Sequence, residues 1–132
     1  MITCKLATGH DMVLGNQWLS IEIKREFPLD FHPDTAVVAY SDQTPVVVIP
    51  IYIEECRRVA VLGHCMTNPA VPGKLKHEAV GQLLEYACRY VKMRACKYLL
   101  GYFGNRAINR IARKRGFLLG DSNVEQLIMI VR

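Results

Sequence analysis

The sequence is poor in the features that mark several classes of protein. Its five cysteines are odd in number and form no C-x-x-C pair, which argues against a disulfide framework and a zinc knuckle. No apolar run approaches the roughly 20 residues that a membrane-spanning helix requires. Repeats and low-complexity segments are lacking, and Met1 begins directly in a strand-like stretch, so no signal peptide is expected. We therefore expect a cytoplasmic protein with no metal site and no membrane partner.

The overall composition is that of one small soluble domain. The 132 residues are 51% hydrophobic and 22% charged, and a domain of this length can bury about two-thirds of its unfolded surface. The formal net charge of +5 favours an anionic ligand or a polyanion without choosing between them. We predict a single domain over residues 1–132.

Hydrophobic periodicity predicts a mixed α/β order of elements. Strands are expected over Ile2–Ala7, Ala36–Tyr40, Pro45–Ile53, Val59–Met66, Tyr98–Phe103 and Leu127–Val131. Helices are expected over Gly9–Glu26, with a weak point at Gly15 and Asn16, over His77–Ala95, and from Asn105 to Gly116. Hairpin-length turns should make the three central strands antiparallel, whereas a helical crossover should make the fourth and fifth strands parallel.

The stretch from Leu99 to Phe117 carries the sharpest local pattern in the chain. Asn105 follows an apolar strand and can cap the next helix, because its side chain accepts hydrogen bonds from free N–H groups. Gly116 suits the left-handed turn that ends a helix, and Phe117 can then fold back onto that helix. Local physics therefore predicts a helix with a defined start and a defined end.

The same stretch resembles the second signature of the GNAT superfamily of N-acetyltransferases, in which a strand leads to N-x-x-A-x-x-x-Y-x-K-x-G-F. Four residues match it: Asn105, Lys114, Gly116 and Phe117. Ala112 stands where the family often has tyrosine, the usual acid toward the departing thiolate. Together with the order of elements, the resemblance implies a GNAT-like fold, with a mixed sheet of six to seven strands flanked by three to four helices. It implies an acetyl-CoA-dependent N-acetyltransferase acting on an amine.

The resemblance places acetyl-CoA where the fourth strand leads into the long helix. In the family a Q/R-x-x-G-x-G/A segment at that helix start cradles the pyrophosphate with backbone N–H groups. The stretch from Lys76 to Gly81 can be laid on this segment, with Ala79 at the first glycine position. Lys74, Lys76 and His77 then bring positive charge to the diphosphate. Gly81 allows the close backbone approach that phosphates need.

The resemblance also assigns residues to the acetyl and pantetheine portions of the cofactor. At the end of the fourth strand these are Cys65, Met66 and Thr67, acting through backbone groups. Asn105 stands where the family often places a residue that touches pantetheine, and it is equally suited to capping its helix. Both roles stay open for Asn105.

Acetyl transfer to an amine needs a base, and His64 is the candidate. Imidazole exchanges protons near neutral pH, although a strand histidine also serves as a hydrogen-bonded structural residue. Cys65 points to the opposite face of a strand, so it cannot easily pair with His64 as a nucleophile. The resemblance implies that the acceptor, a small-molecule or protein amine, binds in a pocket built from Trp18–Phe31 and Gly120–Val124.

Two other functions are alternatives. Five cations crowd the last helix, at Arg106, Arg110, Arg113, Lys114 and Arg115. They form either a solvated face or a surface for nucleic-acid phosphates, and the lack of an aromatic platform disfavours nucleic acid. The altered glycine segment and Ala112 instead fit a GNAT-like fold that has lost its chemistry and serves binding or assembly, for example as a phage virion or host-interaction component. A second copy of the chain, in a homodimer, stays open as a partner. Small, diverged proteins similar to this one are found among phage-encoded genes.

Overall fold

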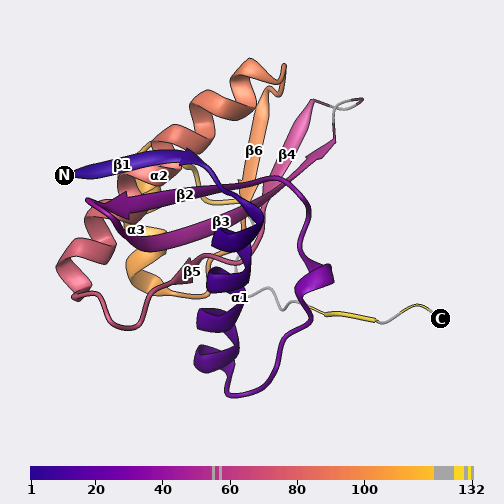
Figure 1. The fold of residues 1–132 in the computed structure, drawn as a ribbon. Helices are drawn as coiled ribbons and strands as arrows, with labels where there is room; N and C mark the ends of the chain where they lie inside the picture. The colour runs from indigo at the N-terminus through magenta and orange to yellow at the C-terminus, as the bar shows by residue number, and fades with distance from the viewer. Residues whose placement is uncertain (55, 57, 121–126, 130, 132) are drawn as a thin grey trace.

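The computed structural model describes residues 1–54, 56, 58–120, 127–129 and 131 (Figure 1). The strands are β1 (Ile2–Leu6), β2 (Ala36–Ser41), β3 (Thr44–Glu54), β4 (Val59–Leu62), β5 (Met66–Thr67) and β6 (Tyr98–Gly101). The helices are α1 (Gly9–Ile23), α2 (Gly73–Met93) and α3 (Arg106–Lys114), with a 3₁₀ turn η1 (Leu29–Phe31) after α1. Up to α3, the order of elements is the one predicted from the sequence, apart from η1 and the division of the predicted fourth strand into β4 and β5.

The strands form one six-stranded mixed sheet. Its order is β1-β2-β3-β4-β6, and β5 pairs with β3 beside that path. β2, β3 and β4 run antiparallel to their neighbours in this series, whereas β4 and β6 are parallel. Both directions confirm the predicted topology, because short turns join the antiparallel strands and a crossover through α2 joins the parallel ones.

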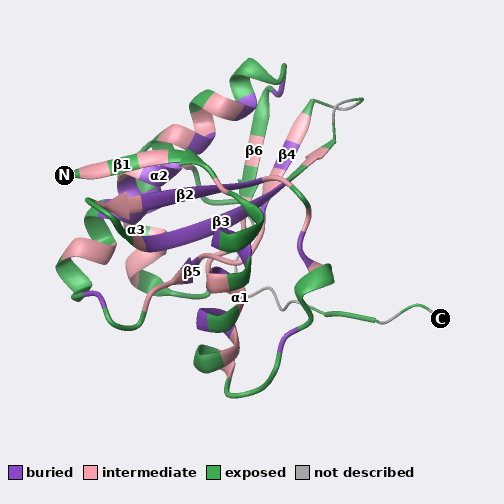
Figure 2. Cartoon of the chain, in the orientation of Figure 1, coloured by how far each residue is buried: buried purple, intermediate pink, exposed green. Residues whose placement is uncertain are grey.

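Helices cover both faces of the sheet (Figures 1 and 2). α2 and α3 pack on one face, where the larger core cluster includes Val37, Ile49 and Leu84. α1 packs on the other face, where Trp18 and Val38 belong to a second cluster. Successive residues of β2 and β3 point into different cores, which explains why these strands are apolar at almost every position. No helix in the described part of the chain is long and apolar enough to cross a bilayer.

The start of α1 is tied to β2 through a buried carboxylate. Asp11 accepts hydrogen bonds from the N–H of Thr8 at 2.8 Å and from its hydroxyl at 3.0 Å, and the hydroxyl of Tyr40 donates to its other oxygen. Burial would raise the pKa of Asp11, but these hydrogen bonds and the charge of Lys5 lower it. The hydrogen bond to Asp11, followed by burial, raises the pKa of Tyr40 to about 12. At neutral pH the cluster therefore holds one carboxylate and one phenol.

α1 lies close to the sheet at Gly15. A Cβ added there would lie 2.9 Å from the Cε of Met66 and 3.1 Å from the Cβ of Val48. Although the sequence marks Gly15 and Asn16 as a weak point, α1 runs unbroken through both. Tertiary contacts explain the difference: Gly15 gives the helix room against the sheet, and Asn16 bonds to the loop that follows α1.

The predicted strand Val59–Met66 is wrong as a single element, because the structure divides it into β4 and β5. The division lies opposite Pro50 of β3, which has no N–H to donate to a neighbouring strand. Gly63 donates its N–H to the Pro50 carbonyl at 2.7 Å. A Cβ at Gly63 would lie 3.2 Å from the Cβ of Pro50, so the glycine keeps this approach close.

The break between β4 and β5 holds one residue more than the facing stretch of β3. Leu62 pairs with Ile51, and Met66 pairs with Val48, so four steps along one strand oppose three along the other. This is the count of a β-bulge, which bends the strand that carries it. His64 lies inside the break and therefore outside the regular ladder.

Three of the larger differences from the prediction concern α1, α2 and the end of the chain, while other element ends move by one or two residues. α1 ends at Ile23, because Lys24 takes a left-handed φ of 57°. α2 begins at Gly73 rather than His77, because the fixed φ and missing N–H of the preceding proline suit a helix start. The described residues of the expected last strand, 127–129 and 131, lie outside any strand. A strand is stable only when it pairs, and these side chains remain exposed.

We expect Gly15→Leu to lower the free energy of unfolding by about 1–3 kcal/mol, the usual cost of overpacking a core. The new side chain has to displace Met66 and the Cβ of Val48. Gly9→Ala is the matched control, because a Cβ at Gly9, in the same helix, meets nothing within 4 Å. Urea unfolding followed by circular dichroism measures both variants. Equal stabilities would contradict the close approach of α1 to the sheet.

Candidate functional site

The parallel pairing of β4 and β6 ends where the break begins. The two strands pair from Val59 opposite Tyr98 to Leu62 opposite Gly101. The next paired segment, β5, bonds to β3 instead, and within the described residues no ladder joins it to β6. The hydrogen-bond ladder is thus open between residues 63–67 and the chain after β6. Amide groups of a ligand can occupy such an opening as a strand would.

The start of α2 follows this opening after a short loop. Asn68 shapes the loop, since its side chain donates to the Pro45 carbonyl at 2.9 Å and accepts from the N–H of Ala70 at 3.0 Å. No side chain caps α2. The N–H groups of Gly73 and the next two residues point out of the helix, as at any helix start. A Cβ at Gly73 would meet nothing within 4 Å, so the space beside this glycine is open.

Positive charge gathers at this helix start. Lys74 and His77 are exposed, and Lys76 is half-buried. The first turn of α2 contains no acidic residue, because Glu78 lies in the second turn. The helix dipole adds partial positive charge at the same end. The arrangement therefore suits an anion with several oxygens.

Gly81 does not lie at the helix start. It is in the third turn of α2, buried against α3, and a Cβ there would lie 2.5 Å from Nη2 of Arg115. Nε of Arg115 donates to the Gly81 carbonyl at 3.3 Å and lies 2.8 Å from Oε1 of Glu85. The register that placed Gly81 beside the pyrophosphate is wrong, because α2 begins at Gly73. Gly81 instead gives Arg115 room between the two helices.

The observed start of α2, from Gly73 to His77, contains no G-x-G pair of the kind found in the family segment. Leu75 packs against the edge of the larger core cluster, whereas His77 is exposed. Lys74 and Lys76 both lie in the first turns of α2.

His64, the predicted base, is half-buried against the loop that joins α1 to β2. Its ring centroid lies 5.3 Å from that of Phe27 and 5.9 Å from that of Phe31. The structure thus brings His64 next to Trp18–Phe31, one of the two segments predicted to hold the acceptor. Of the other predicted segment, only Gly120 falls within the described residues.

A second histidine, His32, belongs to the same group, and sequence reasoning missed it. Its ring centroid is 6.2 Å from that of His64, and the residue is 8% exposed. Nε2 of His32 lies 2.9 Å from Oδ1 of Asn16. Burial, and then the charge of His64, lowers the pKa of His32. One signal in the sequence could have pointed to His32. Two phenylalanines and His32 place three aromatic rings within residues 27–32, in and beside an expected loop.

The three strand-end residues predicted to contact the cofactor differ in exposure. Met66 is fully buried under α1, so only its backbone can face a ligand. Cys65 and Thr67 are half-buried. Burial, and then the charge of Glu22, raises the pKa of Cys65 to about 12. The thiol is protonated at neutral pH, which argues against Cys65 as a nucleophile.

Asn105 caps α3, as predicted. Its Oδ1 accepts hydrogen bonds from the N–H groups of Ala107 at 2.8 Å and Ile108 at 3.3 Å. Asn105 is nevertheless exposed, and its side-chain nitrogen points away from the capped groups because its oxygen serves them. A contact with pantetheine would therefore fall to that nitrogen.

α3 differs from the family pattern in its chemistry. Ala112 is 3% exposed and belongs to the larger core cluster, so no hydroxyl stands at the position of the usual acid. Of the five cations that crowd this helix, Arg115 is engaged by Glu85. The other four are exposed at Arg106, Arg110, Arg113 and Lys114.

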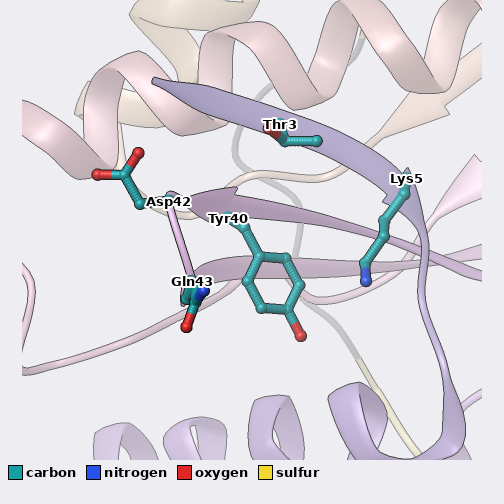
Figure 3. A pocket seen from close by; sticks show the side chains of 5 residues that line it. All are labelled: Thr3, Lys5, Tyr40, Asp42 and Gln43. Carbon is teal, nitrogen blue, oxygen red and sulfur yellow. The ribbon is translucent and has the colours of Figure 1, made fainter.

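A separate pocket of about 290 Å³ lies beside Tyr40 (Figure 3). It is lined by Thr3 and Lys5 of β1, Tyr40 of β2 and the turn residues Asp42 and Gln43. The Lys5 ammonium lies 4.7 Å from the centroid of the Tyr40 ring. No predicted site residue lines this pocket. Among the described residues, no group of three His, Cys, Asp or Glu side chains is placed to hold a metal ion.

No protein-family model and no curated protein matches the sequence. Solved structures match the fold over nearly the whole chain. One, a probable acetyltransferase, shows 11% identity and a TM-score of 0.70 over 98% of this chain and 99% of its own. A ribosomal-protein-alanine N-acetyltransferase from Brucella melitensis biovar Abortus 2308 shows 14% identity and a TM-score of 0.63 over 99% and 100%. A predicted acetyltransferase with acetyl-CoA from Clostridium acetobutylicum shows 14% and 0.63 over 96% of each chain.

These likenesses establish the fold. With the mixed six-stranded sheet, the parallel crossover through α2 and the two-sided helical cover, the chain has the GNAT fold that the resemblance implied.

We expect Cys65 to react slowly with iodoacetamide in the native protein at neutral pH. A pKa raised from 9.0 to about 12 makes the reactive thiolate of Cys65 about a thousandfold rarer. Cys56 is exposed and serves as the internal control. Mass spectrometry of peptides after timed labelling measures both rates. Comparable labelling of the two thiols would show that Cys65 is not shielded.

Proposed function

We propose that this chain is an acetyl-CoA-dependent N-acetyltransferase that transfers an acetyl group to an amine. The observation that carries the proposal is a juxtaposition within the GNAT fold. The ladder between β4 and β6 ends at Leu62, and the uncapped, positively charged start of α2 follows at Gly73. The pantetheine arm of acetyl-CoA is extended, contains amides and leads to phosphates. It therefore requires a strand-like opening for its amides and a positively charged site for its phosphates.

The donors at the start of α2 fit the diphosphate of coenzyme A. Backbone N–H groups of residues 73–75 and the ammonium groups of Lys74 and Lys76 supply donors of the right charge, and no carboxylate stands in the first turn. The exposed His77 adds a further donor. On the two sides of the opening, the backbone of Cys65, Met66 and Thr67 and the side-chain nitrogen of Asn105 would serve the pantetheine amides.

His64 is the proposed base. It lies in the break, beside two phenylalanines of the α1–β2 loop. There it would take a proton from the ammonium of the acceptor and release it to solvent, which leaves the amine lone pair available for attack. Bound acetyl-CoA supplies the acetyl group as an activated thioester. Because Ala112 offers no hydroxyl, the proton for the departing thiolate would come from solvent.

A binding or assembly role without catalysis is the second candidate. Two observations favour it: the start of α2, from Gly73 to His77, has no G-x-G pair, and Ala112 is sealed in the core. Both departures remove features that serve catalysis in the family while leaving the fold intact.

We expect acetyl-CoA to raise the midpoint of thermal unfolding by several degrees. A ligand at 100 times its dissociation constant stabilises the native state by about 2.7 kcal/mol. Desulfo-CoA should act similarly, and the double variant Lys74→Glu, Lys76→Glu should lose most of the shift. The double variant Lys92→Glu, Lys97→Glu has the same net charge, alters exposed lysines away from the helix start and should keep the shift.

The absence of a shift with either ligand would overturn the proposed cofactor site. Salt-sensitive binding of DNA or RNA by such a protein would then favour the basic face of α3. Absence of both activities would favour assembly.

We expect His64→Gln to lower kcat/KM for acetyl transfer, measured over a panel of amines, by about a hundredfold or more. Acetyl-CoA affinity, measured by titration calorimetry, should be unchanged. His10→Gln, at an exposed position on α1, is the control. Unchanged activity in the His64 variant would remove this residue as the base.

A further inference from the structure

The loop of residues 24–35, which joins α1 to β2, is bonded to one face of α1. Nδ2 of Asn16 donates to the carbonyl of Phe27 at 2.8 Å. The N–H of Phe27 donates to the hydroxyl of Ser20 at 3.1 Å, and that hydroxyl donates to the Asn16 carbonyl at 2.9 Å. On the other side, the hydroxyl of Tyr52 donates to the carbonyl of Phe31 at 3.1 Å. The loop is therefore held by a few specific hydrogen bonds, by the short turn η1 and by the burial of Phe27 in the core cluster under α1.

The same network fixes the protonation pattern of His32. Because the side-chain nitrogen of Asn16 donates to Phe27, the side-chain oxygen is the atom that faces His32. An amide oxygen only accepts, so Nε2 of His32 has to be the donor. The neutral ring then carries no hydrogen on Nδ1. That atom is buried and has no hydrogen-bond partner among the described residues.

A proton on Nδ1 of His32 would meet an unsuitable environment. The ring packs beside those of Phe27, at 5.5 Å, and Phe31, at 5.7 Å between centroids. From the break, His64 faces it at 6.2 Å and carries like charge when protonated. The neighbour of the ring on α1 is Asn16, which is neutral. The hydroxyl of Tyr52, on β3, already donates to the carbonyl of Phe31 in the loop. Within the described residues no carboxylate bonds to His32.

We propose that His32 is a positioning residue for the acceptor side of the site. In its neutral form it latches residues 24–35 against His64, and its protonation releases them. The latch is a property of the fold, and only its effect on turnover rests on the proposed acetyltransferase function. Release draws Phe27 and Phe31 away from His64 and so removes the wall against which the acceptor would bind.

The direction of the pH effect follows from the environment of His32. Burial and the charge of His64 lower the pKa of His32 in the closed loop below its ordinary value of 6.5. The open loop then binds the proton more readily than the closed one. The latch is complete above pH 6.5, and it weakens as the pH falls from there toward the lowered pKa.

Trp18 reports on this loop without any assay of activity. It is the only tryptophan in the chain, it is 8% exposed, and it belongs to the same core cluster as Phe27. On acidification below pH 6.5 we expect a change in Trp18 fluorescence while far-ultraviolet circular dichroism stays constant. His32→Phe keeps a ring but cannot titrate, so this change should be lost.

The variant Asn16→Asp distinguishes a His32 that acts through its protonation from one that is merely structural. The variant loses the donor to the Phe27 carbonyl, so its loop is weaker at neutral pH, but a carboxylate beside the ring favours the charged imidazolium and should raise the pKa of His32. Acidification should then tighten the loop instead of releasing it, so the Trp18 signal should move in the opposite direction. His10→Gln is the control and should titrate like the native chain.

The outcomes separate this proposal from the proposed function. A Trp18 transition that persists unchanged in both His32→Phe and Asn16→Asp would overturn the latch, even where acetyl transfer is measured. A transition that follows His32 supports the latch, even in a protein that transfers no acetyl group. Where transfer occurs, KM for the amine should rise below pH 6.5 in the native chain while the affinity for acetyl-CoA stays constant.

Discussion

The break between β4 and β5 is the feature on which the candidate site depends. It lies opposite Pro50, which has no N–H to donate to the facing chain, and Gly63 donates to the Pro50 carbonyl there. The chain inserts one extra residue and resumes pairing with β3 as β5. Because β5 pairs with β3 and not with β6, the ladder between β4 and β6 ends at the break.

The rest of the fold places polar groups around this division. The short loop shaped by Asn68 leads from β5 to α2, so the exposed N–H groups of the helix stand one loop away from the break. On the other face, Gly15 allows α1 to lie directly over β5. The loop after α1 then reaches His64. The start of α2 and the loop after α1, which belong to helices on opposite faces of the sheet, therefore both lie close to the break between β4 and β5.

The sequence predicted what is local. The order of elements, the cap at Asn105 and the left-handed turn at Gly116 follow from side chains that act within a few residues, and all are observed. The break in the fourth strand could not be predicted in this way, because it depends on a proline in a neighbouring strand.

The role of Gly81 was misplaced for the same reason, since its partner Arg115 comes from another helix. His32 was missed because its burial arises from rings that only the tertiary fold assembles. Contacts across the sheet or between helices leave little trace in the pattern of a single segment.

α1 has two ends of different mechanical character. At its first turn, Asp11 joins Thr8 and Tyr40 in a charged cluster that ties the helix to β2. At its last turn, Lys24 adopts a left-handed conformation, and the chain continues without regular structure apart from η1. Toward that end the helix is held by the burial of Trp18 and Leu19 against the sheet. The two ends of α1 are thus held by different forces, one polar and one apolar, and the loop after Lys24 begins from a helix that is fixed at both ends.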